Sequence, residues 1–176
     1  MSLLTRTRAT KPTTPGVLPG AAALLLALRA GGSAGLPGPH PVLAIGVRLG
    51  AQHRRQWAAE DRSRRPGASD GELAATKRMI DQLNGLRAGC VDEIDTWCDR
   101  ALPAGPAEAP LHTETVGSVI DRLAIAVVRA EHLMTGRAAA QLGELAHAYS
   151  VLVADLAAGR RRVPSWRTLK AYGTAR

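Results

Sequence analysis

The chain has 176 residues, of which 45% are hydrophobic but only 3% aromatic, and it contains no phenylalanine. This length suits one domain with one core, and a core of leucine, isoleucine, valine and alanine favours packed helices over a β-sandwich. The net charge of +8 lies at the two ends, because residues 66–158 are net acidic. That distribution argues against a nucleic-acid partner, since such proteins gather basic and stacking aromatic side chains on a folded surface.

Residues 1–16 are basic and rich in proline and threonine, which predicts a disordered tail. The next stretch, Leu18 to Ala30, is predicted to form a short helix capped by Gly31 and Gly32. Basic residues followed by an apolar run also resemble a secretory signal, but Arg29 ends the run and no clean cleavage site follows. No apolar run reaches the roughly 18 residues of a membrane span. We therefore expect a cytoplasmic protein without a membrane segment.

Four longer helices are expected at residues 42–65, 69–100, 115–136 and 141–158. The longest begins near Asp70, because Ser69 and Glu72 have the spacing of a capping box. Gly136 is expected to end the fourth helix, and Gly159 to cap the fifth. The bundle is expected to span residues 17–172, followed by a tail at 173–176. Its last part, with Trp166, Leu169 and Tyr172, is expected to dock back as a short helical turn. The predicted fold is thus an all-α, single-domain bundle of about five helices.

The longest predicted helix has one apolar face and one charged face. The apolar positions are Met79, Leu83, Leu86, Cys90, Ile94 and Trp97. Arg87 lies inside this apolar stripe and therefore needs a carboxylate partner or a route to water. Glu131 lies on the core stripe of the fourth helix and is a natural partner for it, although the sequence cannot place the two side by side.

Motifs for metal binding and for nucleophilic catalysis are weak in this sequence. Cys90 and Cys98 lie too far apart along one helix to bond to each other, and neither belongs to a Cys-x-x-Cys motif. Glu144 and His147 form one Glu-x-x-His motif, whereas a di-iron bundle site needs two of them and further carboxylates. No serine-nucleophile elbow or phosphate-binding glycine loop is present. We expect no metal and no cofactor.

Charged and polar residues spread over three predicted helices give the strongest indication of function. In a bundle, side chains from facing helices can meet in one pocket, where arginine or lysine fixes an anionic or hydroxyl-rich ligand and a carboxylate serves as a base. The alternative is a set of separate ion pairs facing water, such as Glu60 with Arg64. The candidate ligand-binding residues are Trp57, Glu60, Asp61, Arg64, Lys77, Arg78, Asp81, Asn84, Arg87, Glu114, Asp121 and Arg122.

Two segments, QWAAEDRSRRPGASDGELAATKRMIDQLNGLR and TETVGSVIDRLAIAVVRAEHL, resemble the bacterial domain-of-unknown-function family 4254. The resemblance covers almost the whole chain. All the candidate residues except Arg64 fall on its Trp-His-x-Glu-Asp, Lys-Arg-x-Ile-Asp-x-Leu-Asn, Arg-Asn-Asp and Glu-Thr-Pro-Gly-x-x-Ile-Asp-Arg-Leu patterns. Ala58 replaces the histidine, Ala88 and Gly89 replace the Asn-Asp pair, and Val116 replaces the proline. If the family's chemistry needs these residues, the site in this chain is weakened.

Two functions are carried forward as hypotheses. The first is a small biosynthetic enzyme or ligand-binding accessory protein that acts on a polar, sugar-like or anionic metabolite. The resemblance implies a setting of glycan or secondary-metabolite biosynthesis. The second is a non-catalytic interaction module whose basic ends recruit an acidic protein partner, and a homodimer is left open. A chorismate-mutase-like isomerase is a more distant third, because the stretch IDQLNGLR only faintly resembles that family.

Overall fold

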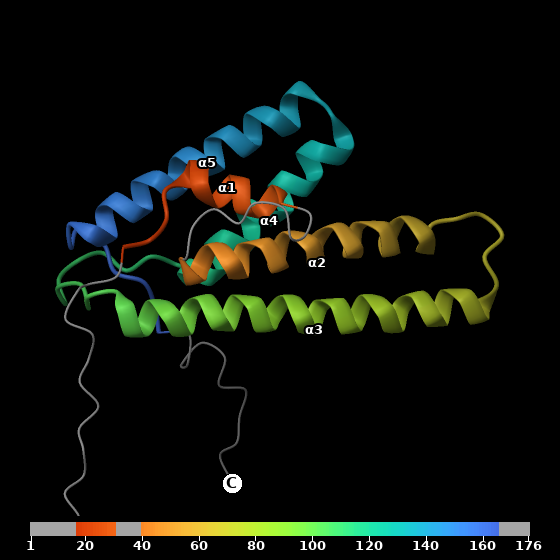
Figure 1. Cartoon of the computed structure of the whole chain (residues 1–176), viewed down its shortest axis with the longest axis horizontal. Coiled ribbons are helices and arrows are strands. Elements are labelled where there is room, and N and C mark those ends of the chain that lie inside the picture. The colour runs from red at the N-terminus through yellow and green to blue at the C-terminus, as the bar shows by residue number, and fades with distance from the viewer. Residues whose placement is uncertain (1–16, 31–39, 166–176) are drawn as a thin grey trace, which may run out of the picture.

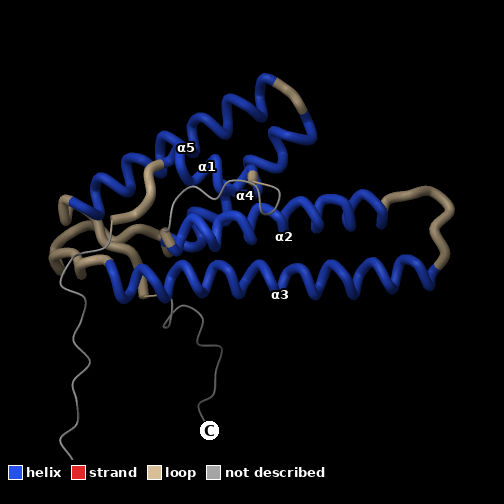
Figure 2. Tube along the Cα trace, viewed as in Figure 1, coloured by secondary structure: helices blue, strands red, loops and turns tan. Residues whose placement is uncertain are grey.

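The computed structural model describes residues 17–30 and 40–165, in which five helices and no strand element are found (Figures 1 and 2). The helices are α1 (Ala21–Arg29), α2 (Pro41–Ser63), α3 (Asp70–Ala101), α4 (Val116–Leu133) and α5 (Gly136–Ala157). The predicted all-α, single-domain bundle is confirmed. The predicted basic tail, the Gly31–Gly32 cap and the docking of Trp166, Leu169 and Tyr172 lie outside the described residues. Within those residues, none of the helices combines the length and apolarity that crossing a membrane requires.

The predicted start of α3 is confirmed by its capping box. The backbone N–H of Glu72 donates to Oγ of Ser69 at 3.4 Å, and the backbone N–H of Ser69 donates to Oε2 of Glu72 at 2.8 Å. The predicted boundary between the last two helices is wrong. α4 ends at Leu133, Met134 adopts a left-handed conformation, and α5 already begins at Gly136. The reason is Thr135, whose hydroxyl accepts from the N–H of Ala138 and so starts a helix where the glycine was expected to stop one.

α2 and α3 form a long antiparallel hairpin that the other helices cover only in part. α2 packs against α1, α3 and α4, while α4 also packs against α3 and α5. In Figure 1 the turn between α2 and α3 projects to the right, beyond the turn between α4 and α5. Only α2 and α4 cover α3 extensively, so the predicted apolar stripe of α3 is not buried throughout: Met79 and Leu86 are 41% and 46% exposed.

The core is formed by α1, α2, α4 and α5 together with the second half of α3, which packs against α2 and α4. Its fully buried side chains are Leu24, Leu28, Leu49, Ile94, Ile120, Leu123, Val127 and Tyr149. Tyr149 is buried together with its hydroxyl, which donates to the carbonyl oxygen of Pro19 at 2.8 Å. The pKa of this phenol is raised by burial. At Gly50 the backbone of α1 comes so close that a Cβ would lie 2.1 Å from the carbonyl oxygen of Leu28.

Candidate functional site

Two adjoining cavities form a groove between α2, α3 and α4, which we call the interhelical groove. The Trp57 cavity has a volume of about 250 Å³ and is lined by His53, Gln56, Trp57, Glu60, Arg64, Arg87, Ile125 and Val128. The Glu114 cavity has a volume of about 460 Å³ and is lined by Arg87, Ala88, Val91, Glu114, Ser118, Asp121, Arg122 and Ile125. Arg87 and Ile125 belong to both linings, so the two cavities meet at these side chains.

A cluster of three charged or titratable side chains from three helices lies at this junction. Asp121 of α4 is only 16% exposed, and its Oδ1 lies 2.8 Å from Nε2 of His53 on α2. The same oxygen lies 3.6 Å from Nε of Arg87 on α3. His53 is buried, with 6% of its surface exposed. Asp121 therefore joins both walls of the groove through one carboxylate oxygen.

The contact with Asp121 also determines which nitrogen of His53 carries a proton. An ionised carboxylate only accepts hydrogen bonds, so Nε2–H of His53 donates to it. In a neutral imidazole the lone pair is then on Nδ1. Among residues 17–30 and 40–165 no side chain or backbone group forms a hydrogen bond with this atom. His53 consequently offers an oriented hydrogen-bond acceptor at the Trp57 cavity.

The wall of the Trp57 cavity is held in place by contacts on its far side. The ring of Trp57 packs on His132 of α4 with centroids 4.7 Å apart and an interplanar angle of 33°. The ring nitrogen Nδ1 of His132 donates in turn to the carbonyl oxygen of Val128 at 2.9 Å. Nε2 of Gln56 donates to Oδ1 of Asn84 at 3.0 Å, which ties α2 to α3 beside the cavity. The indole thus presents a fixed apolar surface.

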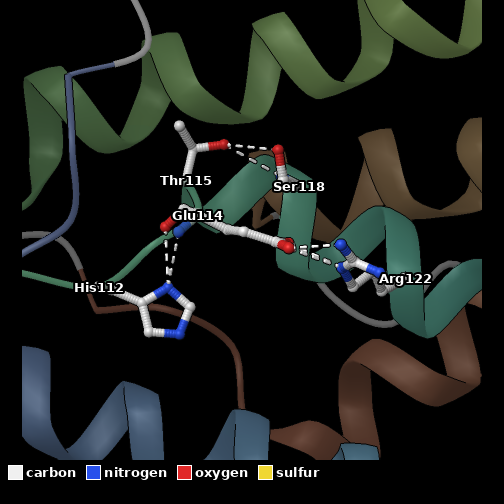
Figure 3. A network of polar contacts seen from close by, with 5 residues as sticks. All are labelled: His112, Glu114, Thr115, Ser118 and Arg122. Atoms are coloured by element: carbon white, nitrogen blue, oxygen red, sulfur yellow. Dashed lines mark hydrogen bonds and ion pairs between the residues drawn. The ribbon is translucent and has the colours of Figure 1, made fainter. Parts of the chain in front are cut away.

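Glu114 and Arg122 both line the Glu114 cavity and pair with each other. Nε of Arg122 donates to both carboxylate oxygens of Glu114, at 2.9 and 2.8 Å, and Nη2 makes a third hydrogen bond to the same group. This guanidinium holds the pKa of the Glu114 carboxyl below its usual value. The carboxylate raises the pKa of Arg122 in return. Figure 3 shows the two side chains pointing toward one another beside the first turn of α4.

The start of α4 is fixed close to α3 by two caps. The hydroxyl of Thr115 accepts from the N–H of Ser118 at 3.2 Å, and the buried Asp95 of α3 accepts from the N–H of Gly117 at 2.7 Å. A Cβ on Gly117 would lie 2.5 Å from the carbonyl oxygen of Val91, so a larger residue would push the helices apart. A carboxylate at a helix N-terminus is favourable because it faces the positive end of the helix dipole. These contacts position Asp121, one turn further on, at the groove.

The twelve residues predicted to bind ligand do not all meet. Trp57, Glu60, Arg64, Arg87, Glu114, Asp121 and Arg122 line the interhelical groove, and Asn84 adjoins it through Gln56. Asp61, Lys77, Arg78 and Asp81 are exposed and are not among its lining residues. Lys77 pairs with Asp81 at 3.5 Å within α3. Their part of the hairpin lies toward the α2–α3 turn, away from the first turns of α4 that complete the Glu114 cavity.

The expected pairing of Arg87 with Glu131 is wrong. Arg87 lies beside Asp121, whereas Glu131 accepts from Nε of Arg54 on α2 at 3.0 Å. Nη2 of Arg54 also donates to the carbonyl oxygen of Leu28 at the end of α1. Arg54 therefore joins α2 to both α1 and α4, and Glu131 is engaged by it. The need of Arg87 for a carboxylate was predicted correctly, but not the residue that supplies it.

Seven residues that line the groove were missing from the predicted set: His53, Gln56, Ile125 and Val128 at the Trp57 cavity, and Ala88, Val91 and Ser118 at the Glu114 cavity. The sequence does carry a signal for His53, which shares one stripe of α2 with Trp57 and Arg64. Nothing in the sequence links His53 to Asp121, since the two are 68 residues apart. Of the four positions that depart from the family pattern, one lies in the groove and three do not. Ala88 lines the Glu114 cavity, while Ala58 and Gly89 are exposed outside both linings and Val116 is buried.

Metal-binding groups do not gather in the described part of the chain. Residues 17–30 and 40–165 contain no cluster of three or more histidine, cysteine or acidic side chains arranged to hold a metal ion. Glu144 and His147 are both exposed on α5. The groove offers instead one arginine at its centre, a histidine–carboxylate pair and an aromatic wall. These are groups that bind anions, exchange protons and pack against flat apolar surfaces.

Comparison with known proteins gives one positive finding. Residues 47–141 match the family model described as "Protein of unknown function (DUF4254)". No curated protein and no solved structure matches the chain. The matched range covers more than half of the chain and contains every residue that lines the interhelical groove. The chain therefore belongs to this family of proteins of unknown function, as its sequence motifs indicated.

Proposed function

We propose that the interhelical groove binds a polar, anionic or sugar-like metabolite, and that the protein is a small biosynthetic enzyme or ligand-binding accessory protein of secondary-metabolite or glycan biosynthesis. The observation that carries this proposal is the state of Arg87. Its guanidinium lines both cavities, its ion pair with Asp121 is long at 3.6 Å, and it makes no hydrogen bond to any other residue of the described ranges. A guanidinium with unengaged N–H groups is suited to bidentate binding of a carboxylate or phosphate.

The other two arginines of the groove are less suited to bind an anion than Arg87, because both are already paired with carboxylates. Arg122 is held by Glu114, and Arg64 pairs with Glu60 at 3.4 Å and with Asp61 at 3.6 Å. An incoming anion would have to displace a carboxylate from either of them. Arg87 approaches Asp121 through Nε, so its terminal NH2 groups can bind an anion while that pair is kept, and at 32% exposure it is partly desolvated, which strengthens a charge-assisted hydrogen bond.

His53 supports the enzymatic form of the proposal. Asp121 orients the ring so that the lone pair of Nδ1 is available, and a histidine held by a carboxylate is the usual arrangement for general base catalysis. In this role Nδ1 accepts a proton from a ligand hydroxyl, and Asp121 stabilises the imidazolium that forms. Arg87 lies next to the same carboxylate, so the anionic group of the ligand is bound close to the proton-accepting atom.

The alternative, an interaction module with basic ends, gains no support from the arginines that follow α5 in the described ranges. Nε of Arg160 and Nε of Arg161 lie 2.9 and 3.5 Å from Asp155, and Nε of Arg162 donates to the carbonyl oxygen of Ala109 at 3.0 Å. These cations are engaged within the fold, which leaves fewer free groups for an acidic partner.

The test is a binding screen with a matched pair of arginine variants. Sugar phosphates, hydroxy acids and dicarboxylates are screened by thermal shift and confirmed by calorimetry. Arg87→Gln is expected to weaken binding tenfold or more, because a hydrogen bond to a charged group contributes about 1.5–3 kcal/mol. Arg48→Gln is the control, since Arg48 likewise pairs with a carboxylate on a neighbouring helix, that of Glu93, but lies outside the groove. The proposal fails if no anion binds the unaltered protein, or if both variants bind it equally well.

The catalytic part has its own variant. His53→Gln keeps a hydrogen bond donor for Asp121 but replaces the imidazole, so ligand binding is expected to persist while turnover of that ligand falls by a factor of 100 or more, the usual contribution of a general base being roughly 10²–10⁴. Turnover at the unaltered rate in His53→Gln would show that the protein does not use His53 as a base.

A further inference from the structure

We infer that the ligand of the interhelical groove has two parts: a flat apolar group that occupies the Trp57 cavity, joined to an anionic group held at Arg87 on the side of the Glu114 cavity. This inference rests on the proposed function and specifies its ligand. It follows from the size, the lining and the junction of the two cavities.

The sizes of the cavities favour one ligand that extends across both. Ligand sites in proteins are typically about 300–1,000 Å³. The Trp57 cavity, at about 250 Å³, is smaller than this, so a ligand that occupies it extends beyond it, whereas the Glu114 cavity, at about 460 Å³, lies within the range. They adjoin at Arg87 and Ile125, which belong to both linings, so a molecule that lies across these two side chains contacts both cavities.

The Trp57 cavity presents apolar surface and few free polar groups. Trp57, Ile125 and Val128 supply its apolar lining. Of its polar side chains, Glu60 is engaged with Arg64 and Gln56 with Asn84, which leaves Nδ1 of His53 and the guanidinium of Arg87 at the boundary. A sugar ring placed here would find few partners for its hydroxyl groups and would lose its hydration. A flat apolar group would instead pack on the indole, whose ring is also held by its contact with His132.

The Glu114 cavity differs in chemistry. Four charged side chains line it, two of each sign. Three of them have a close partner: Glu114 and Arg122 pair with each other, and Asp121 pairs with His53. Arg87 is the fourth, at the boundary with the Trp57 cavity. An anion that contacts Arg87 therefore lies directly beside the apolar cavity, so the two parts of the ligand must be joined by a short link.

The inference is tested with three probes on the full-length protein: inorganic phosphate, phenyl phosphate and 1-naphthyl phosphate. Dissociation constants are measured by calorimetry and binding sites by chemical-shift mapping. We expect the affinity to rise in that order, with 1-naphthyl phosphate at least tenfold tighter than phosphate. Equal affinities for phosphate and 1-naphthyl phosphate, both lowered by Arg87→Gln, would overturn the two-part ligand and leave the proposed function standing. No binding of any anion would overturn both.

Substitutions of tryptophan locate the apolar part. Trp57→Leu is expected to weaken 1-naphthyl phosphate about fivefold to tenfold, as expected for a lost aromatic pair, and to leave phosphate unchanged. Trp57→Phe retains most of the affinity. Trp97→Leu is the matched control, because Trp97 packs on His40 with ring centroids 4.9 Å apart, outside the groove. Unaltered affinity in Trp57→Leu, or shift changes confined to another cavity, would refute the assignment. Circular dichroism and thermal melts confirm that each variant is folded.

Discussion

Replacing Gly50 by alanine tests the closest approach between two helices of this fold. The added Cβ would lie 2.1 Å from the carbonyl oxygen of Leu28, more than 1 Å inside ordinary contact, and the obstacle is backbone that no rotamer can move. Overpacking of this kind costs about 1–3 kcal/mol. Moving Leu28 also loosens its hydrogen bond from Nη2 of Arg54, which is 2.8 Å long. A hydrogen bond from a charged donor contributes about 1.5–3 kcal/mol, while alanine gains about 0.5–1 kcal/mol in helix propensity. We expect a net loss of about 2–4 kcal/mol in the free energy of unfolding.

Gly46, one turn earlier in α2, supplies the control for this measurement. A Cβ there would meet Leu24 at 3.5 Å and Ala27 at 3.6 Å, which are ordinary contacts. Gly46→Ala is therefore expected to be neutral or to stabilise the protein by up to about 1 kcal/mol through helix propensity. Both variants are compared by urea denaturation monitored by circular dichroism. If Gly50→Ala is as stable as Gly46→Ala, then α1 does not pack against α2 as described, and the position of Arg54 must be reconsidered.

Three further predictions concern side chains that the fold buries or places in ion pairs. Asp121→Asn is expected to lower the free energy of unfolding by about 1–3 kcal/mol in urea denaturation, because it removes the negative charge that His53 and Arg87 share. Glu93→Gln, in the exposed pair with Arg48, is expected to change it by less than about 0.5 kcal/mol. Burial raises the pKa of Cys98 to about 12. Iodoacetamide at pH 8 is therefore expected to alkylate this thiol at least about a hundredfold more slowly in the folded protein than in urea. Equal rates would show that the thiol is accessible in the fold. The pKa of Glu114 is lowered by Arg122, so the stability that this pair contributes is present above the pKa of the unfolded state and is lost as the pH falls through the pKa of the folded state. Arg122→Gln is therefore expected to raise the pKa of Glu114, measured by carbon NMR. An unchanged pKa would contradict the pairing.

The helices were predictable because their signals are local. The box formed by Ser69 and Glu72 and the cap at Thr115 each lie within four residues of the groups they bind, so spacing alone identifies them. The boundary at Thr135 was missed although its signal is equally local. A glycine was interpreted as a stop, but a threonine in front of it starts the next helix, and its hydroxyl satisfies an N–H that the glycine cannot.

The site was predictable only as far as each helix face. Periodicity places Arg87 within the apolar stripe of α3, and so predicts a carboxylate partner, but both Asp121 and Glu131 lie on α4 and meet that requirement. The choice between them depends on where α4 crosses the hairpin, which Gly117 and Asp95 fix through a contact that spans 22 residues. The same crossing explains why Lys77 and Asp81 pair with each other: their segment of α3 lies nearer the α2–α3 turn.

The departures from the family pattern can be separated by the same geometry. Ala88 lines the Glu114 cavity beside Arg87, so Ala88→Asn adds an amide within reach of a bound anion, whereas Ala58 is exposed and lines neither cavity. One added hydrogen bond contributes about 0.5–1.5 kcal/mol, which corresponds to a roughly twofold to tenfold gain in affinity. We expect this gain for an anion that binds at Arg87 in Ala88→Asn, and no change in Ala58→His. If calorimetry shows the gain for Ala58→His instead, the family's histidine acts on a different surface, and the interhelical groove is not where this family binds its ligand.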